Sequence, residues 1–396
     1  MLKNILRLSP SILFTVIGSY SIFFDSWAKF FVPTMHPVFA DLRSITATSE
    51  CYLTDSSWTF NSESCDPWGR QFNYPIIWLK IFSTLGFTEQ YTFELGLSFF
   101  LLLALSLLYW NLQIISRKFH IWQPVLLGAI YVSPPILLLA ERGNTDALIF
   151  AFTTLLVLIT SGRATFLSLI AFAGLAYLKI FVISALVTSL FQKIDLKRIV
   201  FSISLVFLVI WQLQQDLFYI RSFTSYSFWT SFGMNVIPMG LENILSIKLN
   251  NFQNFSLGLI LLFSAIILLS KIDRNYYSNI DSTQFRSDKN YNSLVLYAGI
   301  LITVFFLGTS YDYRLVFIVP ILQLISSNLD SDFRKKILGI VILMVMYLSR
   351  LGVLSILGDI IFLFLMSHLI LLFYFITFPK LTIRSILKSV QNFFVK

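Results

Sequence analysis

The sequence predicts an all-α polytopic integral membrane protein with about twelve transmembrane helices, in a range of ten to thirteen. Three observations support this class. Hydrophobic residues make up 57% of the 396 residues and charged residues only 12%, about half the charged fraction of an ordinary soluble domain. Apolar runs recur from the first residues to the last. Basic residues collect in the segments between those runs, as they do in chains that cross a membrane repeatedly.

Twelve apolar segments are expected as spans, and several are shorter than the ~20 residues that a full crossing needs. The first one follows the basic start "MLKNILRLSP", which is typical of a signal peptide. No small-residue cleavage site follows it, so we interpret it as a retained span. The expected spans are 11–31, 94–110, 121–139, 147–160, 164–179, 180–191, 199–216, 255–270, 291–307, 314–327, 337–350 and 354–378.

The distribution of Lys and Arg predicts the side of the membrane on which each segment lies. With the N-terminus in the cytoplasm, about two thirds of the 29 Lys and Arg residues fall in cytoplasmic loops and tails, in agreement with the positive-inside rule. Both termini are then cytoplasmic. The net charge of +9 is therefore a topology signal, with membrane lipids as its expected partner. No nucleic acid partner is expected.

We expect a single transmembrane domain over 1–396, in which four segments differ from the apolar runs. A large first outer loop covers about 32–93, and an aromatic second outer loop covers about 217–254. A polar cytoplasmic connector covers about 271–290, and the tail 379–396 has the pattern of a basic amphipathic anchor. No internal repeat is evident, which weakens the case for a transporter built from inverted repeats.

The chain has two cysteines, Cys51 and Cys65, and both lie in the first outer loop. In an oxidising compartment, this pair predicts a disulfide that closes part of the loop. The alternative is two free buried thiols. We predict no metal site, because the three histidines are scattered along the sequence and form no ligand cluster.

Five polar clusters fall at the outer ends of the expected spans. The topology that places them there was assigned from other charged residues. The clusters include three cations, Arg142, Lys179 and Arg314, which run against the positive-inside bias. Cations at that surface would suit a phosphate, and arginine can bind one through two hydrogen bonds. The clusters are "FADLRS", "CDPWGRQFNYP", "AERGNTDAL", "AYLKIF" and "GTSYDYRLVF".

Each cluster also has an interpretation that needs no ligand. Asp41 could cap the helix that follows it, and Asp66 precedes a proline and could open a turn. Glu141 and Arg142 could pair with each other at the membrane surface. Lys179 could extend its ammonium group from a helix end, and the tyrosines of "SYDY" could belong to an interfacial aromatic belt.

Together, these motifs resemble a family of bacterial membrane glycosyltransferases. "ADLRSIT", "DPWGRQFNYPIIWLKIF", "ERGNTDALIFAF", "LKIFVISAL" and "YDYRLVFIVPIL" are similar to glycosyltransferase family 87, the polyprenol-phosphate-mannose-dependent mannosyltransferases of the GT-C class. The sequence departs from the family pattern at Ser44 and Ile45, where the family has a tyrosine nearby, and at Ile180, where it has a proline after the lysine. The resemblance implies a GT-C fold in the bacterial inner membrane, with the active site facing the periplasm or exterior.

The resemblance also implies a reaction and its residues. Such enzymes transfer a sugar from a polyprenyl-phosphate donor to a lipid or glycan acceptor with inversion, which requires a general base and cations for the departing phosphate. Asp41 is the expected base, with Asp66 as the alternative. The expected donor-phosphate ligands are Lys179, Arg314 and Arg70. The expected substrate-binding residues are Tyr74, Glu141, Arg142, Asn144, Asp146, Tyr311 and Asp312.

No cofactor is predicted, and the sequence gives no support for a divalent cation. Asp330 and Asp332 form a DxD motif of the sort that binds metal and nucleotide in soluble glycosyltransferases, but capping of the following helix explains it better. Two other functions stay open. One is a transporter or flippase of a lipid-linked or anionic solute, and the other is a ligase or polymerase of lipid-linked glycans.

Overall fold

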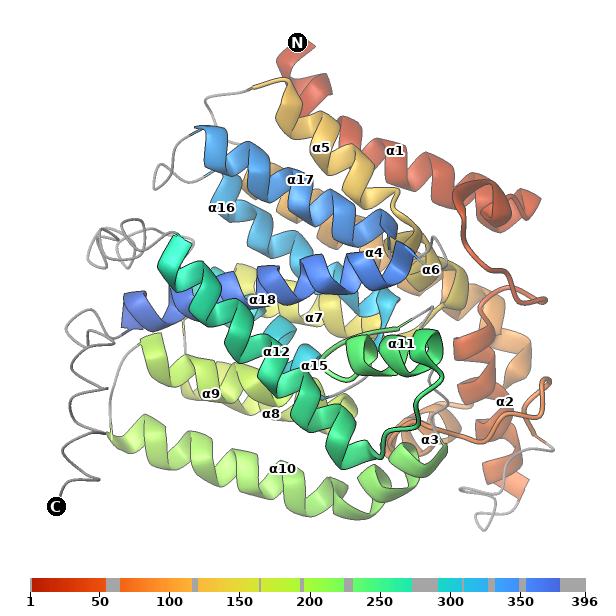
Figure 1. Cartoon of the computed structure of the whole chain (residues 1–396). Helices are drawn as coiled ribbons and strands as arrows, with labels where there is room; N and C mark the ends of the chain where they lie inside the picture. Colours follow the sequence, from red (N-terminus) through yellow and green to blue (C-terminus); the bar gives the residue numbers. More distant parts are fainter. Residues whose placement is uncertain are drawn as a thin grey trace, which may run out of the picture.

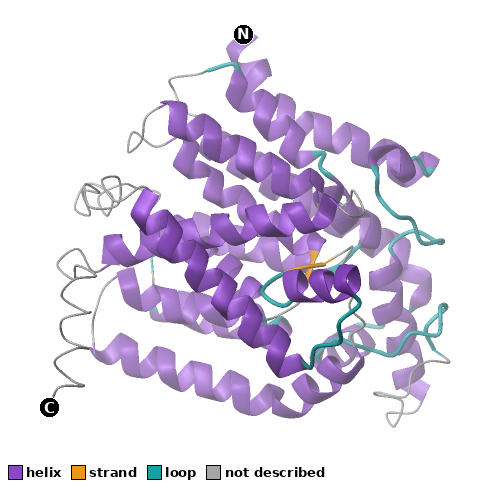
Figure 2. Ribbon diagram, in the orientation of Figure 1, coloured by secondary structure: helices purple, strands orange, loops and turns teal. Residues whose placement is uncertain are grey.

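The computed structural model describes residues 2–54, 65–115, 120–163, 165–192, 196–223, 231–272, 291–307, 310–326, 332–348 and 354–377. Helices dominate this part of the chain (Figure 1), and Figure 2 shows one short pair of strands among them. The protein is thus an all-α membrane protein with a minimal β-ladder. The expected connector 271–290 lies outside the described residues after Ile272, and the expected tail 379–396 lies outside them entirely.

Among the residues that the structure describes, five helices are long and apolar enough to cross a membrane. They agree with the expected spans near the same positions but extend beyond several predicted bounds. These helices are α1 (Leu2–Phe24), α4 (Thr92–Ile114), α10 (Leu196–Phe223), α12 (Asn251–Ile272) and α18 (Ser355–Thr377). The total of twelve spans stays a prediction.

The expected span 121–139 is a bent pair of helices. Helix α5 (Trp122–Tyr131) and helix α6 (Pro134–Arg142) meet at an angle of 42°, and the pair counts as a sixth membrane-length segment if it forms one span. The bend falls where Pro134 and Pro135 occupy the first positions of α6. Proline suits the first turn of a helix, but it disfavours helical geometry in the residue before it. Two consecutive prolines therefore end α5 and start α6.

The remaining helices of the expected spans are shorter. Helix α7 (Thr145–Thr160) is capped by Asn144, whose side chain accepts from the backbone N–H of Asp146. Helix α8 (Phe166–Leu178) begins with a capping box between Thr165 and Ser168. The others are α9 (Ile183–Gln192), α15 (Tyr291–Phe306), α16 (Gln323–Ser326) and α17 (Asp332–Leu348). Helix α17 begins at Asp332, whereas Asp330 of the DxD motif lies outside the described residues, so capping by this motif stays a prediction.

The expected span 314–327 is largely a 3₁₀-helix, η6 (Asp312–Leu322), which leads into α16. A 3₁₀-helix rises about 2 Å per residue, so its 11 residues cover about 22 Å. Strand β2 (Ser310–Tyr311) precedes it and pairs antiparallel with β1 (Ser231–Phe232) of the second outer loop. This ladder fastens the second outer loop to the start of η6.

The segments that we expect on the outer side consist of short elements between the long helices. The first outer loop contains α2 (Ala40–Thr54), α3 (Ile77–Thr84) and η3 (Glu89–Tyr91), and η1 (Trp27–Phe30) follows α1. The second outer loop contains α11 (Val236–Leu245) after β1. A further 3₁₀ turn, η4 (Ile180–Val182), joins α8 to α9. Figure 1 shows α2 and α3 side by side at one end of the molecule.

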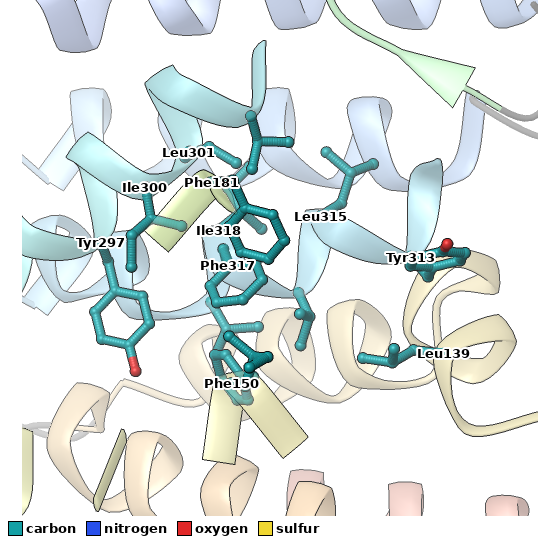
Figure 3. Packing of buried hydrophobic residues seen from close by; sticks show 14 of the residues in the cluster. Leu139, Phe150, Phe181, Tyr297, Ile300, Leu301, Tyr313, Leu315, Phe317 and Ile318 are labelled. Carbon is teal, nitrogen blue, oxygen red and sulfur yellow. The ribbon is translucent and has the colours of Figure 1, made fainter. Parts of the chain in front are cut away.

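A cluster of aromatic rings fixes η6 inside the protein (Figure 3). The Phe317 ring of η6 lies 5.6 Å from the Phe150 ring of α7 and 5.3 Å from the Phe181 ring of η4. Tyr297 of α15 lies 6.0 Å from Phe150. Such pairs contribute about 0.5–1.5 kcal/mol each beyond the area that they bury. The cluster therefore fixes the positions of α7, η4 and η6 relative to one another. These elements carry or adjoin the polar groups described next.

Candidate functional site

One carboxylate, that of Asp146, binds two cations from distant parts of the chain. Lys179 Nζ lies 3.1 Å from Oδ1, and Arg314 Nε lies 3.0 Å from Oδ2. The Asp146 side chain is fully buried, and those of Lys179 and Arg314 are 9% and 19% exposed. Buried charges need partners because leaving water is costly. Two cations on one carboxylate leave this triad with a net charge of +1.

Local structure explains how these three residues meet. Asp146 lies in the first turn of α7, directly after the turn formed by Gly143 and Asn144. Gly143 has a φ of +57°, and a Cβ there would lie 3.0 Å from the Cβ of Phe39, so the tight connection from α6 to α7 requires glycine. Lys179 has extended backbone between α8 and η4. Its Nζ lies 4.6 Å from the centre of the Tyr74 ring, a cation–π distance.

Asn144 connects this triad to a second carboxylate. Its Nδ2 donates to Asp41 Oδ2 at 2.6 Å and to the Tyr74 hydroxyl at 3.2 Å. Its Oδ1 accepts from the backbone N–H of Asp146 at 2.9 Å. Asp41 is the second residue of α2, so it lies inside the first turn and not at the capping position that precedes the helix. A single amide thus joins Asp41, Tyr74 and Asp146.

Arg70 bridges two acidic residues of the first outer loop, Asp41 and Asp66. Its Nε and Nη2 donate to Asp66 at 3.0 and 3.1 Å, and its Nη1 donates to Asp41 Oδ1 at 3.3 Å. Nη2 also donates to the backbone carbonyl of Ala40 at 2.8 Å. Asp66 forms the expected turn as well, because its carboxylate accepts from the backbone N–H of Arg70 at 2.9 Å. The Trp68 ring lies 4.7 Å from the guanidinium carbon.

Exposure separates the three carboxylates of the site. The Asp66 and Asp146 side chains are fully buried, whereas that of Asp41 is 15% exposed. Arg70, beside Asp41, is 33% exposed. Asp41 is therefore the most accessible of the three carboxylates. Because Asp66 is fully buried beneath Arg70 whereas Asp41 is partly exposed, the geometry favours Asp41 over Asp66 as a proton acceptor.

Two groups of the first outer loop have shifted pKa values. Partial burial lowers the pKa of Arg70, but the hydrogen bond to Asp66 and the charges of Asp41 and Asp66 raise it further, so the net shift is upward. Burial, followed by the charge of Asp41, raises the pKa of Tyr74 well above 10. Arg70 is thus a permanent cation, and Tyr74 is a neutral phenol that can both donate and accept a hydrogen bond.

Glu141 and Arg142 do not contact the residues around Asp41 and Asp146 through hydrogen bonds or ion pairs in the described part of the chain. They form an ion pair with each other at 3.1 Å, which is the pairing that the sequence predicted. Glu141 Oε1 also accepts from the backbone N–H of Met35 at 2.9 Å, and its carbonyl accepts from the N–H of Phe39 at 2.9 Å. Arg142 Nη2 donates to the carbonyl of Pro33 at 3.4 Å. The pair thus anchors segment 33–39, which leads into α2 and Asp41. A substrate contact for either residue stays a prediction.

The cluster "GTSYDYRLVF" brings to the site residues for which the sequence predicted no role. The Tyr311 ring stacks on the Tyr313 ring at 5.5 Å, and the Asp312 side chain is buried. Arg314 Nη1 donates to the Ser310 hydroxyl at 3.2 Å, and the Phe181 ring lies 5.2 Å from the Arg314 guanidinium carbon. We did not predict roles for Ser310 and Phe181, nor for Trp68 beside Arg70. The sequence gives only a weak indication of these roles, which is closeness to a predicted cation. Phe181 lies two residues after Lys179, and Ser310 lies four residues before Arg314.

The two cysteines form the disulfide that their number and location predict. Cys51 in α2 joins Cys65, with their Cα atoms 6.2 Å apart. Because Cys65 precedes Asp66 directly, the bond connects α2 to the turn that carries Asp66 and Arg70. Among the residues that the structure describes, no three His, Cys, Asp or Glu side chains are grouped as metal ligands would be.

No family model matches the sequence, and neither a curated protein nor a solved structure matches it significantly. The resemblance to glycosyltransferase family 87 therefore rests on short motifs, and the chemistry has to be argued from the arrangement of the side chains.

Proposed function

We propose that this protein is an inverting glycosyltransferase of the bacterial inner membrane. It moves a sugar, mannose-like or another hexose or pentose, from a polyprenyl-phosphate donor to a lipid-linked or glycan acceptor at the outer face. One observation supports this most directly. The accessible carboxylate of Asp41 is connected through Asn144 to Asp146, which holds the cations Lys179 and Arg314. A proton acceptor and a cationic group thus lie together, as glycosyl transfer from a lipid phosphate requires.

Asp41 is the general base of the proposed reaction. As the acceptor oxygen bonds to the anomeric carbon, its proton passes to Asp41. The bond from that carbon to the phosphate oxygen breaks, and the electron pair leaves with the lipid phosphate. Asn144 and Arg70 each donate to one oxygen of Asp41, which fixes the orientation of the carboxylate while further lone pairs stay available to the acceptor hydroxyl.

The triad of Asp146, Lys179 and Arg314 is the proposed phosphate site. Its net charge of +1 complements the single negative charge of a phosphodiester between a sugar and a lipid. An ammonium group has three N–H donors, and one ion pair with Asp146 leaves Lys179 able to contact a phosphate oxygen as well. Fixed cations at this place would stabilise the charge that develops on the leaving group. The neutral phenol of Tyr74 would then bind a sugar hydroxyl.

Substitution of the base tests the proposal. Asp41→Asn keeps the size of the side chain and removes the proton acceptor, so transfer should fall about 10²–10⁴-fold. The assay measures transfer of a labelled sugar from a polyprenyl phosphate in membranes that contain equal amounts of each variant. Asp25→Asn is the matched control, because it is the same substitution at an exposed aspartate that pairs with His36. Full activity of Asp41→Asn would contradict the proposal.

A transporter or flippase is the second candidate, and the bend between α5 and α6 favours it, since transporters often use broken helices at their binding sites. Counterflow of a lipid-linked or anionic solute in proteoliposomes, without chemistry, would support transport. Transfer of a single labelled sugar supports the glycosyltransferase, and transfer of a whole glycan would support a ligase or polymerase.

A further inference from the structure

Helix α10 carries an acidic residue to which the proposed reaction assigns no role. Large apolar side chains are exposed along this helix, such as those of Phe207, Trp211 and Phe218, as expected for a helix in contact with lipid. Asp216 differs from them, because it is only 7% exposed. It lies at the outer end of the expected span 199–216. An ionisable residue in a membrane helix is costly to insert and commonly has a function.

Asp216 binds the backbone at the start of α3. Its Oδ2 accepts a hydrogen bond from the N–H of Ile76 at 3.0 Å, and Ile76 immediately precedes the first residue of α3. Figure 1 shows α3 close to the end of α10. The first N–H groups of a helix have no partner within that helix, so a carboxylate beside them is favourable. Asp216 thus attaches the start of α3 to α10.

A second hydrogen bond attaches α3 to the end of α8. Trp78 of α3 is 2% exposed, and its Nε1 donates to the carbonyl of Leu178 at 3.1 Å. Leu178 is the last residue of α8 and directly precedes Lys179. A buried indole N–H usually finds such a partner. The segment 74–78 is therefore attached to α10 through Asp216 and to α8 beside Lys179.

The step from Tyr74 to Pro75 carries this attachment into the site. Proline locks its own φ and restricts the residue before it to extended backbone, so little freedom separates the attached N–H from the tyrosine. The Tyr74 ring lies 4.6 Å from Lys179 Nζ, and its hydroxyl accepts from Asn144 Nδ2 at 3.2 Å. The hydrogen bond of Asp216 therefore helps to fix the Tyr74 ring beside the Lys179 ammonium group.

We propose that Asp216 is a positioning residue, which holds Tyr74 against Lys179 from a helix outside the site. This inference rests on the proposed function, in which Tyr74 binds a sugar hydroxyl and Lys179 contacts the donor phosphate. Without the hydrogen bond to Asp216, the ring moves relative to the ammonium group. The sugar and the phosphate are then no longer held in one orientation. A misplacement of about 1 Å can lower a rate about 10²-fold.

Coupling between Asp216 and Tyr74 in the labelled-sugar assay tests this proposal. Asp216→Ala should lower kcat about 10–100-fold, with a smaller change in the KM of the donor, because the cations that bind the phosphate remain. Asp216→Asn keeps an oxygen that accepts from an N–H and should restore most of kcat. In a Tyr74→Ala background, Asp216→Ala should lower kcat little further, since the ring that it positions is absent. Equal losses in both backgrounds, or full activity of Asp216→Ala, would overturn the proposal.

Hydrogen exchange in the purified full-length protein, in lipid nanodiscs, measures the attachment without an assay of transfer. Mass spectrometry should show that Asp216→Ala accelerates exchange within 74–78 about tenfold. Glu50→Ala is the control, because Glu50 accepts in the same way from the backbone N–H of Glu89 at the start of η3, at 3.2 Å. It should change neither this exchange nor kcat.

The two measurements separate failure of the inference from failure of the proposed function. Exchange at the wild-type rate in Asp216→Ala would overturn the attachment whatever the activity. A wild-type protein that transfers no sugar would contradict the proposed function, and with it the role of Tyr74, even where the exchange data confirm the attachment.

Discussion

The substitution Asp146→Asn should destabilise the protein strongly, because it leaves two cations without their carboxylate. Water screens this triad little, since Asp146 is fully buried and the side chains of Lys179 and Arg314 are 9% and 19% exposed. Removal of one partner from a buried ion pair costs about 3–5 kcal/mol. Lys179→Met should cost less, about 1.5–3 kcal/mol, because Asp146 keeps its contact with Arg314.

A double-mutant cycle measures this difference. Unfolding of Asp146→Asn, Lys179→Met and the double variant is followed by tryptophan fluorescence in mixed micelles of increasing SDS content. The loss in the double variant should be smaller than the sum of the single losses by about 0.5–3 kcal/mol, since the second substitution removes the unpaired ammonium. Strictly additive losses, or a loss for Asp146→Asn no larger than for the exposed control Asp25→Asn, would refute the assignment of a buried triad.

Two further predictions concern the structure around the site. Replacing both Cys51 and Cys65 by Ser removes a disulfide with a sequence separation of 14 and should lower the free energy of unfolding by about 3 kcal/mol. A reductant should then lower the unfolding temperature of the wild type but not of the variant. An equal response of both proteins would contradict this prediction. Gly96→Ala places a Cβ in the buried ring of Phe39 and should cost about 1–3 kcal/mol. Gly174→Ala, where nothing lies within 4 Å, should gain up to about 1 kcal/mol, so equal unfolding temperatures of the two alanine variants would show that this packing is wrong.

Much of the candidate site could be predicted from the sequence, because charges beside apolar runs are costly and therefore informative. Asp41, Asn144, Asp146, Lys179 and Arg314 come from four separate segments, and a continuous chain of contacts joins them in the structure. Their common location followed from a topology based on other basic residues. The separate function of Glu141 and Arg142 in anchoring segment 33–39 could not be foreseen, since their partners are backbone groups that leave no trace in sequence.

The backbone geometry of the spans was less predictable. An apolar run has a similar composition whether it forms an α-helix, the 3₁₀-helix Asp312–Leu322 or two short helices at an angle. Pro134 and Pro135 were a usable signal for the bend. Asp359, which is buried in α18, was not singled out, because it is a single acid inside the apolar run "SILGDIIFLFLM".

The lengths of α7 and α8 determine how far below the membrane surface Asp146 and Lys179 would lie. These consecutive helices contain 16 and 13 residues, or about 24 and 20 Å at 1.5 Å per residue, whereas the hydrocarbon core of a bilayer is about 30 Å thick. With their connecting turn at one membrane surface, the opposite ends, which carry Asp146 and Lys179, would stop about 6–10 Å short of the other surface. A lipid-linked substrate would then bind below the plane of the headgroups. Its prenyl chain could stay in the bilayer while its sugar is transferred.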